Sequence, residues 1–275
     1  IVAIGSVACA LYVALKPKYG NIKLGNIDKP AYSNFKWGTM IFTSTMAADI
    51  MFYSLIEWAL YGAEPHLAEM GSMQMWAPTY TLFHWGPLAW GFYVILAVCF
   101  GFMMHVRKRE RQRFSEACRP LFGDKVDGFW GKVIDVIAIF AVVCATATTF
   151  SLATPLLTKA MGSVFGFEVT TTITILVLLL ICSIYTITVL FGVTGISKLA
   201  SICSFLFFGI LLYFLFFGGE TRYIIETGFQ SLGNLAQNFV GLSTYMDPLR
   251  ENGFAQNWTV YYWAYWLVWC VATPF

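Results

Sequence analysis

Long runs of apolar residues separated by short polar connections dominate this sequence. A helix needs about 20 residues to cross the roughly 30 Å hydrocarbon layer of a bilayer. The runs predict about seven crossings, near residues 1–16, 36–60, 82–105, 133–157, 169–191, 196–218 and 257–275. The pattern therefore predicts an all-α integral membrane protein with a single transmembrane domain.

Residues 220–245 follow a different pattern. Five apolar side chains recur there at spacings of three and four residues among polar neighbours: Phe229, Leu232, Leu235, Phe239 and Leu242. That spacing is typical of an amphipathic helix. The segment is too polar to span a bilayer, so we expect it to lie along the outer, periplasmic membrane surface between two spans.

The sequence begins and ends within apolar runs. Residue 1 is Ile1 rather than methionine, and Phe275 ends the last run. We therefore expect the sequence to be a fragment of a longer polytopic protein.

The composition excludes several classes of protein. Hydrophobic residues make up 58% of the chain and charged residues 12%, against roughly 25% charged residues in soluble domains. The net charge of +2 leaves no basic footprint for nucleic acid, which we exclude as a partner. The seven cysteines form no C-x-x-C pair that would indicate a metal motif.

The basic residues predict the orientation of the spans. Of the 17 Lys and Arg residues, 14 lie in the alternate connections 16–36, 106–132 and 192–198. Basic residues near span ends are retained on the cytoplasmic side of the membrane. The first span therefore runs from outside to inside, and the connection 106–132 is expected in the cytoplasm.

Two acidic residues fall inside the predicted span 36–60. Acidic side chains are costly within a membrane, which makes Asp49 and Glu57 functional candidates. Glu57 is expected near the outer end, where water or a neighbouring helix end solvates it. Asp49 has either a cation-related role or a helix-fixing one.

Small and hydroxyl-bearing residues precede Asp49, in the stretch 43–49 that includes Met46. Such residues allow close helix packing, or satisfy carbonyls that a break in the helix leaves free. Interrupted helices at mid-membrane hold ion and substrate sites in secondary transporters. Thr146 and Thr149 lie in a second polar stretch before Pro155, where their hydroxyls could bind an ion or only the helix backbone.

Aromatic residues make up 18% of the chain. The informative ones form two groups: Trp85, Trp90 and Tyr93, and then Tyr262, Tyr265, Trp266 and Trp269. Trp266 and Trp269 lie too deep for an interfacial belt. Electron-rich rings with few carboxylates suit a quaternary ammonium, because the ring quadrupole attracts the cation without a counter-charge. Core packing is the alternative interpretation of the same spacing.

Several segments together resemble the betaine/carnitine/choline transporter family: Tyr19–Gly25, Trp37–Glu57, Phe83–Trp85 with Trp90 and Tyr93, Gly195–Ile196, and Trp258–Trp266. The resemblance implies a fold of twelve spans, in which spans three to seven and eight to twelve form an inverted repeat. On that map residues 1–16 are a partial span, 36–218 the first five-helix repeat, and 257–275 the first helix of the second repeat. This piece alone is not expected to transport.

The resemblance also implies what the protein binds and where it resides. It implies secondary transport of trimethylammonium compounds, without a cofactor, by a homotrimer in the bacterial inner membrane. The family's aromatic substrate box corresponds to six positions, all aromatic here: Trp85, Trp90, Tyr93, Tyr265, Trp266 and Trp269.

Two departures from the family pattern affect ion coupling. Sodium-coupled members carry Gly-Met-Gly where this sequence has Thr45-Met46-Ala47, which puts the ion site and the helix break in doubt. Lys198 aligns with an arginine whose charge replaces sodium in a carnitine-exchanging member. We therefore expect sodium-independent exchange with Lys198 as the ion surrogate, whereas a cytoplasmic anchor is the alternative role for this lysine.

If sodium is used instead, Met46, Thr146 and Thr149 are the candidate ion-site residues, and the protein is a sodium-coupled betaine or choline symporter. A membrane osmotic sensor or a channel is the alternative of another class. An enzyme is not expected. His84 and His105 stand at opposite ends of one predicted span, roughly 31 Å apart along a helix, and His66 lies in an outer loop. The three histidines are therefore not expected to hold one metal ion.

Overall fold

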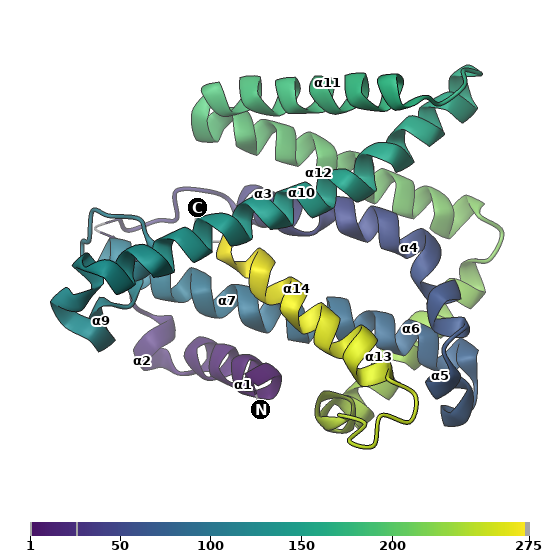
Figure 1. Ribbon diagram of the computed structural model, residues 1–275, viewed down its shortest axis with the longest axis horizontal. Coiled ribbons are helices and arrows are strands. Elements are labelled where there is room, and N and C mark those ends of the chain that lie inside the picture. Colours follow the sequence, from purple (N-terminus) through teal and green to yellow (C-terminus); the bar gives the residue numbers. More distant parts are fainter. Residues whose placement is uncertain (1, 26, 273–275) are drawn as a thin grey trace. The chain divides into compact units, whose positions relative to one another are not determined.

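A computed structural model gives the fold and describes residues 2–25 and 27–272 (Figure 1). Every regular element in those residues is a helix, which confirms the all-α class. The α-helices are α1 (Val2–Leu15), α2 (Pro17–Gly20), α3 (Asn34–Thr45), α4 (Ala47–Gly62), α5 (Pro65–Met70), α6 (Met73–Trp85), α7 (Pro87–Gly101), α8 (Phe114–Ala117), α9 (Arg119–Phe122), α10 (Phe129–Phe165), α11 (Thr171–Leu190), α12 (Gly192–Phe217), α13 (Thr221–Thr244) and α14 (Tyr261–Trp269). The π-helices are η1 (Phe102–Val106) and η3 (Ala255–Val260), and the 3₁₀ helices are η2 (Gly123–Asp127) and η4 (Cys270–Ala272).

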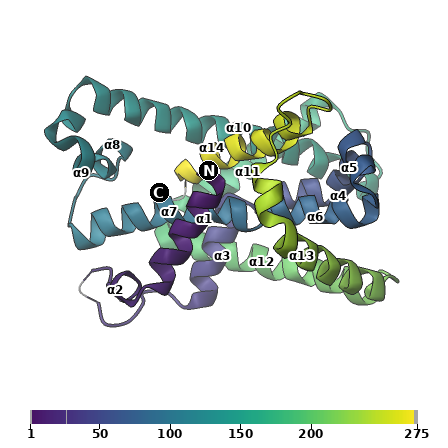
Figure 2. The same cartoon turned by 90° about the horizontal axis from the view of Figure 1, so that it is seen from below.

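The chain divides into two compact units, and α4 and α10 each contribute to both. The first unit comprises Ile1–Pro30, Glu57–Cys144 and Arg222–Phe275, as far as these ranges are described. In it, α1 packs against α7 (Figure 2). The approach is closest at Gly91, where a Cβ would lie 2.9 Å from Cγ2 of Val7, so any larger residue would push the two helices apart.

The second unit comprises Ala31–Ile56 and Ala145–Thr221. Here α3 packs against α12, and α11 packs against α12. Two ring pairs join α3 to α12, Phe35 with Phe205 and Phe42 with Phe207, each with centroids 5.1 Å apart. At the start of α3 the Ser33 hydroxyl accepts a hydrogen bond from the Lys36 backbone N–H, which caps the helix.

Five of the seven predicted spans have counterparts among the described helices. Four helical segments are each long and apolar enough to cross a membrane: Met73–Val106, Phe129–Phe165, Thr171–Leu190 and Gly192–Phe217. The pair α3 and α4 meets the same criterion jointly, although it is bent by 62°. The first run forms the shorter helix α1, and the last is divided among η3, α14 and η4. The expected count of about seven is thus not met by helix length in the described residues.

The segment predicted to be amphipathic forms α13, within the expected limits. Its apolar face is divided in a way that spacing alone did not predict. Leu235 and Leu242 are buried, whereas Phe229 and Leu232 are 74% and 57% exposed. One part of the surface of α13 therefore packs against other elements of the first unit, and another part carries exposed apolar side chains.

Candidate functional site

A break between α6 and α7 positions the first aromatic group. Gly86 lies between the helices, and a Cβ there would fall 2.3 Å from the Leu82 carbonyl oxygen, so only glycine fits this backbone. Pro87 follows as the first residue of α7, where its missing N–H costs nothing. The sequence Gly-Pro thus interrupts the span directly after Trp85 and before Trp90.

The structure brings five of the six predicted box residues into one connected set of rings in the first unit. Trp266 of α14 is at the centre, with its ring centroid 4.9 Å from that of Trp85, 6.2 Å from Tyr93 and 5.2 Å from Tyr265. Trp90 joins through Tyr93, at 5.8 Å. Residues far apart in sequence therefore form one aromatic cluster.

Burial of the ring and one hydrogen bond together hold the Trp266 side chain in place. Its ring is fully buried, and its indole Nε1 donates to the backbone carbonyl of His84 at 2.7 Å. A helix break leaves nearby carbonyls without intrahelical partners, and a side-chain donor can satisfy them. The break in one helix is thus used to orient the central ring of another.

Trp269 does not share these contacts. It is buried, but no ring contact joins it to the cluster in the described part of the chain. Its indole nitrogen likewise lacks a hydrogen-bond partner among the described residues. All four residues of the second aromatic group, Tyr262, Tyr265, Trp266 and Trp269, lie on α14, although Trp269 is set apart from the cluster.

Glu57 lies beside the cluster, and the expectation for it was wrong. Its side chain is 1% exposed rather than solvated at an outer end. The carboxylate accepts hydrogen bonds from Trp85 Nε1 at 2.9 Å, from the Tyr61 hydroxyl at 3.0 Å and from the Tyr262 hydroxyl. Three aromatic donors surround this carboxylate because a buried charge needs hydrogen-bonding partners.

The network continues from Glu57 to a buried histidine. The Tyr61 hydroxyl also lies 2.5 Å from His84 Nδ1, and His84 Nε2 lies 3.2 Å from the Thr259 hydroxyl. The His84 ring stacks on Tyr262 with centroids 4.6 Å apart. Sequence reasoning missed Tyr61, although its position one helical turn after Glu57 places the two side chains on the same face.

The cluster is closed in this structure. A cation held by cation–π contacts lies within about 6 Å of each ring centroid, so two rings on opposite sides of it stand farther apart than the 4.9 Å between Trp85 and Trp266. These two rings meet edge to face, at an interplanar angle of 75°. Binding between them therefore requires the rings to separate.

A second histidine, His66, lies where α5 meets the loop that follows α13, in the first unit. His66 is buried and stacks on Tyr245 with centroids 4.5 Å apart. Its Nε2 lies 3.2 Å from the Tyr80 hydroxyl, and its Nδ1 lies 3.4 Å from the Asn252 amide nitrogen. Burial lowers the pKa of His66, because the charged imidazolium loses hydration there.

The helix interruption, one of the two interpretations left open for the stretch 43–49, is present in the second unit. Helices α3 and α4 are separated at Met46, whose φ of −135° and ψ of −22° depart from helical values. The Met46 side chain is buried. The break therefore forms although neither flanking residue is glycine.

Asp49 and Thr149 meet in the same unit. The Thr149 hydroxyl lies 3.0 Å and 3.2 Å from the two oxygens of the buried Asp49 carboxylate. Oxygen ligands of this kind are those that hard cations prefer. Thr146, on the same helix, has an exposed side chain. The structure thus brings Thr149 to the acidic side chain.

Lys198 lies in the second turn of α12 with an exposed side chain. The described residues supply it with no hydrogen bond or ion pair within 4.0 Å. An exposed ammonium fits the anchor interpretation as well as it fits the ion-surrogate interpretation.

The comparisons with known proteins agree on one family. A family model described as "BCCT, betaine/carnitine/choline family transporter" matches residues 1–275. A curated protein of Desulfitobacterium hafniense (strain Y51), named "Probable glycine betaine transporter", is 31% identical over 256 residues. That match covers 92% of this chain and 51% of the relative, so the chain spans about half the length of the curated protein it matches.

Proposed function

The chain belongs to the betaine/carnitine/choline transporter family, and we propose that it forms part of a secondary transporter for trimethylammonium compounds such as betaine, carnitine or choline. The family and the matched relative are transporters rather than enzymes. The observation that carries the proposal is the ring cluster around Trp266, in which segments about 180 residues apart in sequence meet.

The chemistry of the cluster supports this substrate class. A trimethylammonium group cannot donate strong hydrogen bonds, and the faces of Trp and Tyr rings attract it through their quadrupoles. In the proposal, Trp85, Trp90, Tyr93, Tyr265, Trp266 and Trp269 form the substrate box. The substrate enters when Trp85 and Trp266 separate from the closed arrangement.

Glu57 acts in this proposal as a positioning residue. Its carboxylate holds the indole nitrogen of Trp85 and the hydroxyl of Tyr262, and the rings of both residues contact Trp266. When the cluster opens, these hydrogen bonds keep the Trp85 and Tyr262 rings in place. No proton transfer or covalent step is required.

We propose sodium-independent exchange as the mode of transport, with Lys198 as the built-in cation. Its support is the alignment of Lys198 with the arginine of a carnitine-exchanging member. In this mode one substrate enters as another leaves, and the fixed ammonium supplies the charge that sodium supplies elsewhere.

Sodium-coupled uptake is the second candidate, and a different observation favours it. The helix breaks at Met46, and Asp49 with Thr149 places three oxygen atoms together in the same unit. A broken helix beside oxygen ligands is the arrangement that coordinates sodium in secondary transporters. In this mode Lys198 is a cytoplasmic anchor.

Uptake by the full-length protein in liposomes tests these proposals. Labelled carnitine and glycine betaine are offered with and without a sodium gradient, and with and without unlabelled substrate inside. Uptake that needs internal substrate and ignores sodium supports exchange, whereas sodium-dependent uptake into empty liposomes supports symport.

Two further outcomes of this assay would refute transport itself. Saturable binding without flux would identify a sensor, and flux that neither saturates nor shows counterflow would identify a channel. Failure to bind either compound would contradict the proposed substrate class.

A further inference from the structure

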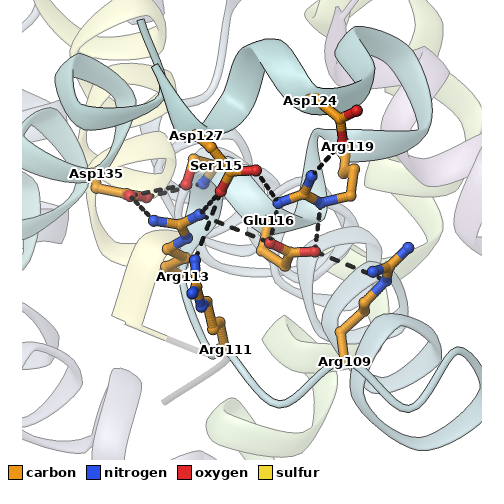
Figure 3. Close-up of polar contacts among 9 residues, drawn as sticks. All are labelled: Arg109, Arg111, Arg113, Ser115, Glu116, Arg119, Asp124, Asp127 and Asp135. Atoms are coloured by element: carbon orange, nitrogen blue, oxygen red, sulfur yellow. Dashed lines mark hydrogen bonds and ion pairs between the residues drawn. The ribbon is translucent and has the colours of Figure 1, made fainter. Parts of the chain in front are cut away.

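The connection between α7 and α10 folds around an unusually dense set of charges (Figure 3). Glu116 is buried, and its carboxylate accepts hydrogen bonds from Arg119 Nε at 2.6 Å and Nη2 at 2.8 Å. Arg119 also bonds Asp127 at 2.8 Å, and Arg113 bonds the same carboxylate at 2.6 Å. These hydrogen bonds from Arg119 hold the pKa values of Glu116 and Asp127 below their usual range, so both remain ionised.

Within this cluster, Glu116 is shared among more cations than a single carboxylate can neutralise. Glu116 has three guanidinium groups within 4.0 Å, those of Arg109, Arg113 and Arg119. Arg109 and Arg113 both lie 3.7 Å from Glu116, but Arg113 also bonds Asp127 at 2.6 Å. Among the described residues Arg109 has no second acid within 4.0 Å, and its side chain is 53% exposed. Its charge is therefore the least neutralised of these three.

Arg107 has no acidic partner within 4.0 Å in the described part of the chain. Its guanidinium instead lies over the ring of Phe102, 5.5 Å from the centroid. The chain turns sharply between the two arginines, because Lys108 adopts a positive φ of 53°, a conformation uncommon for a residue with a side chain. This turn follows the π-helix η1, and Arg107 and Arg109 both line the same groove.

That groove has a volume of about 370 Å³ and two kinds of wall. One wall is apolar and comes from the last turns of the predicted span, including Val98, Cys99 and Phe102. Val98 is 41% exposed, although it belongs to a helix apolar enough to span a membrane. The charged part of the lining consists of Arg107 and Arg109 together with the paired Glu116 and Arg119. An apolar wall that ends at two incompletely neutralised guanidinium groups matches an anionic amphiphile.

We propose that this groove binds an anionic glycerophospholipid, with the phosphate held by Arg107 and Arg109 and an acyl chain along Val98 and Phe102. Guanidinium groups form strong, directional hydrogen bonds with phosphate oxygens. Basic pockets at the cytoplasmic ends of membrane helices are suited to anionic headgroups. The positive-inside pattern places this connection in the cytoplasmic leaflet, where such lipids are available.

The test counts lipids bound to the full-length protein after release from nanodiscs that contain phosphatidylglycerol and phosphatidylcholine. Native mass spectrometry measures retained phosphatidylglycerol in the wild type and in R107Q/R109Q. The matched control is K125Q/K132Q, which removes the same charge from exposed lysines that lie outside the groove. We expect retention to fall about ten-fold in R107Q/R109Q and to stay at the wild-type level in the control.

A second variant tests the apolar wall without a change of charge. Val98→Trp fills the groove and is expected to lower phosphatidylglycerol retention as well. Equal losses in both double variants would overturn the proposal, since they would show only diffuse attraction to the basic surface. Unchanged retention in R107Q/R109Q or in Val98→Trp would also overturn it, as would displacement of the lipid by inorganic phosphate, which has no acyl chains.

Discussion

Replacement of Trp85 tests the aromatic box most directly, because its two roles in the structure can be separated. The ring contacts Trp266 at 4.9 Å between centroids, and the indole nitrogen donates to Glu57. Trp85→Leu removes both the ring and the donor. Trp85→Phe keeps a ring face but removes the donor.

The expected magnitudes follow from these two contacts. Loss of one ring from a cation–π cage weakens substrate binding by about 1–2 kcal/mol, or roughly 5- to 30-fold in Kd. Loss of the donor leaves one buried oxygen of Glu57 with a missing partner and lowers the free energy of unfolding by about 1–3 kcal/mol. Substrate affinity should therefore decrease in the order wild type, Trp85→Phe, Trp85→Leu, whereas both variants should lose stability.

The assay is equilibrium binding of labelled substrate to the purified full-length protein, with thermal unfolding measured on the same samples. Trp266→Leu should weaken binding to the same extent. Trp130→Leu is the matched control, since Trp130 is 71% exposed at the start of α10, outside the cluster. Unchanged affinity in Trp85→Leu and Trp266→Leu, in folded protein, would refute the box.

Three further predictions concern coupling and pH. Thr149→Val removes the hydroxyl that bonds Asp49, so the sodium concentration for half-maximal uptake should rise if sodium is coupled; unchanged sodium dependence would exclude this site. Lys198→Ala should abolish exchange or make it sodium-dependent, and wild-type exchange without sodium would remove Lys198 from the mechanism. His66 has a pKa below its unfolded value of about 6.5, so the folded state binds fewer protons. Stability should be full above that value and fall as the pH drops below it towards the lowered pKa, in thermal unfolding scans, and His66→Gln should flatten this dependence.

The closed cluster explains why the spacing of the aromatic residues in the sequence was compatible with both core packing and a binding site. In the structure Trp266 is fully buried in the core of the first unit, and it contacts Trp85 and Tyr93, which the resemblance assigns to the box. The ring pairs have the geometry of ordinary aromatic packing. Substrate binding by the Trp85 and Trp266 variants separates the two roles.

Much of the architecture could be predicted from the sequence, because membrane spans depend on local composition. Apolar length predicted four continuous helices and the bent pair, and residue spacing predicted α13. Backbone polar groups in lipid must be satisfied within the helix, so an apolar run of sufficient length has few alternatives to a helix. The small and hydroxyl-bearing residues before Asp49 were compatible with the interruption at Met46 but equally with close helix packing.

What sequence patterns could not determine were the pairings between distant segments. Glu57 was expected at a solvated helix end, yet Tyr61, Trp85 and Tyr262 enclose it, and the Thr149 hydroxyl reaches Asp49 from 100 residues further along the chain. Hydrophobic periodicity specifies which residues a helix buries but not which helix covers them. That choice depends on how breaks such as Gly86-Pro87 direct the helices and on which buried polar groups find partners. The tertiary structure therefore decided the surroundings of each candidate residue, while the sequence alone determined the helices that carry them.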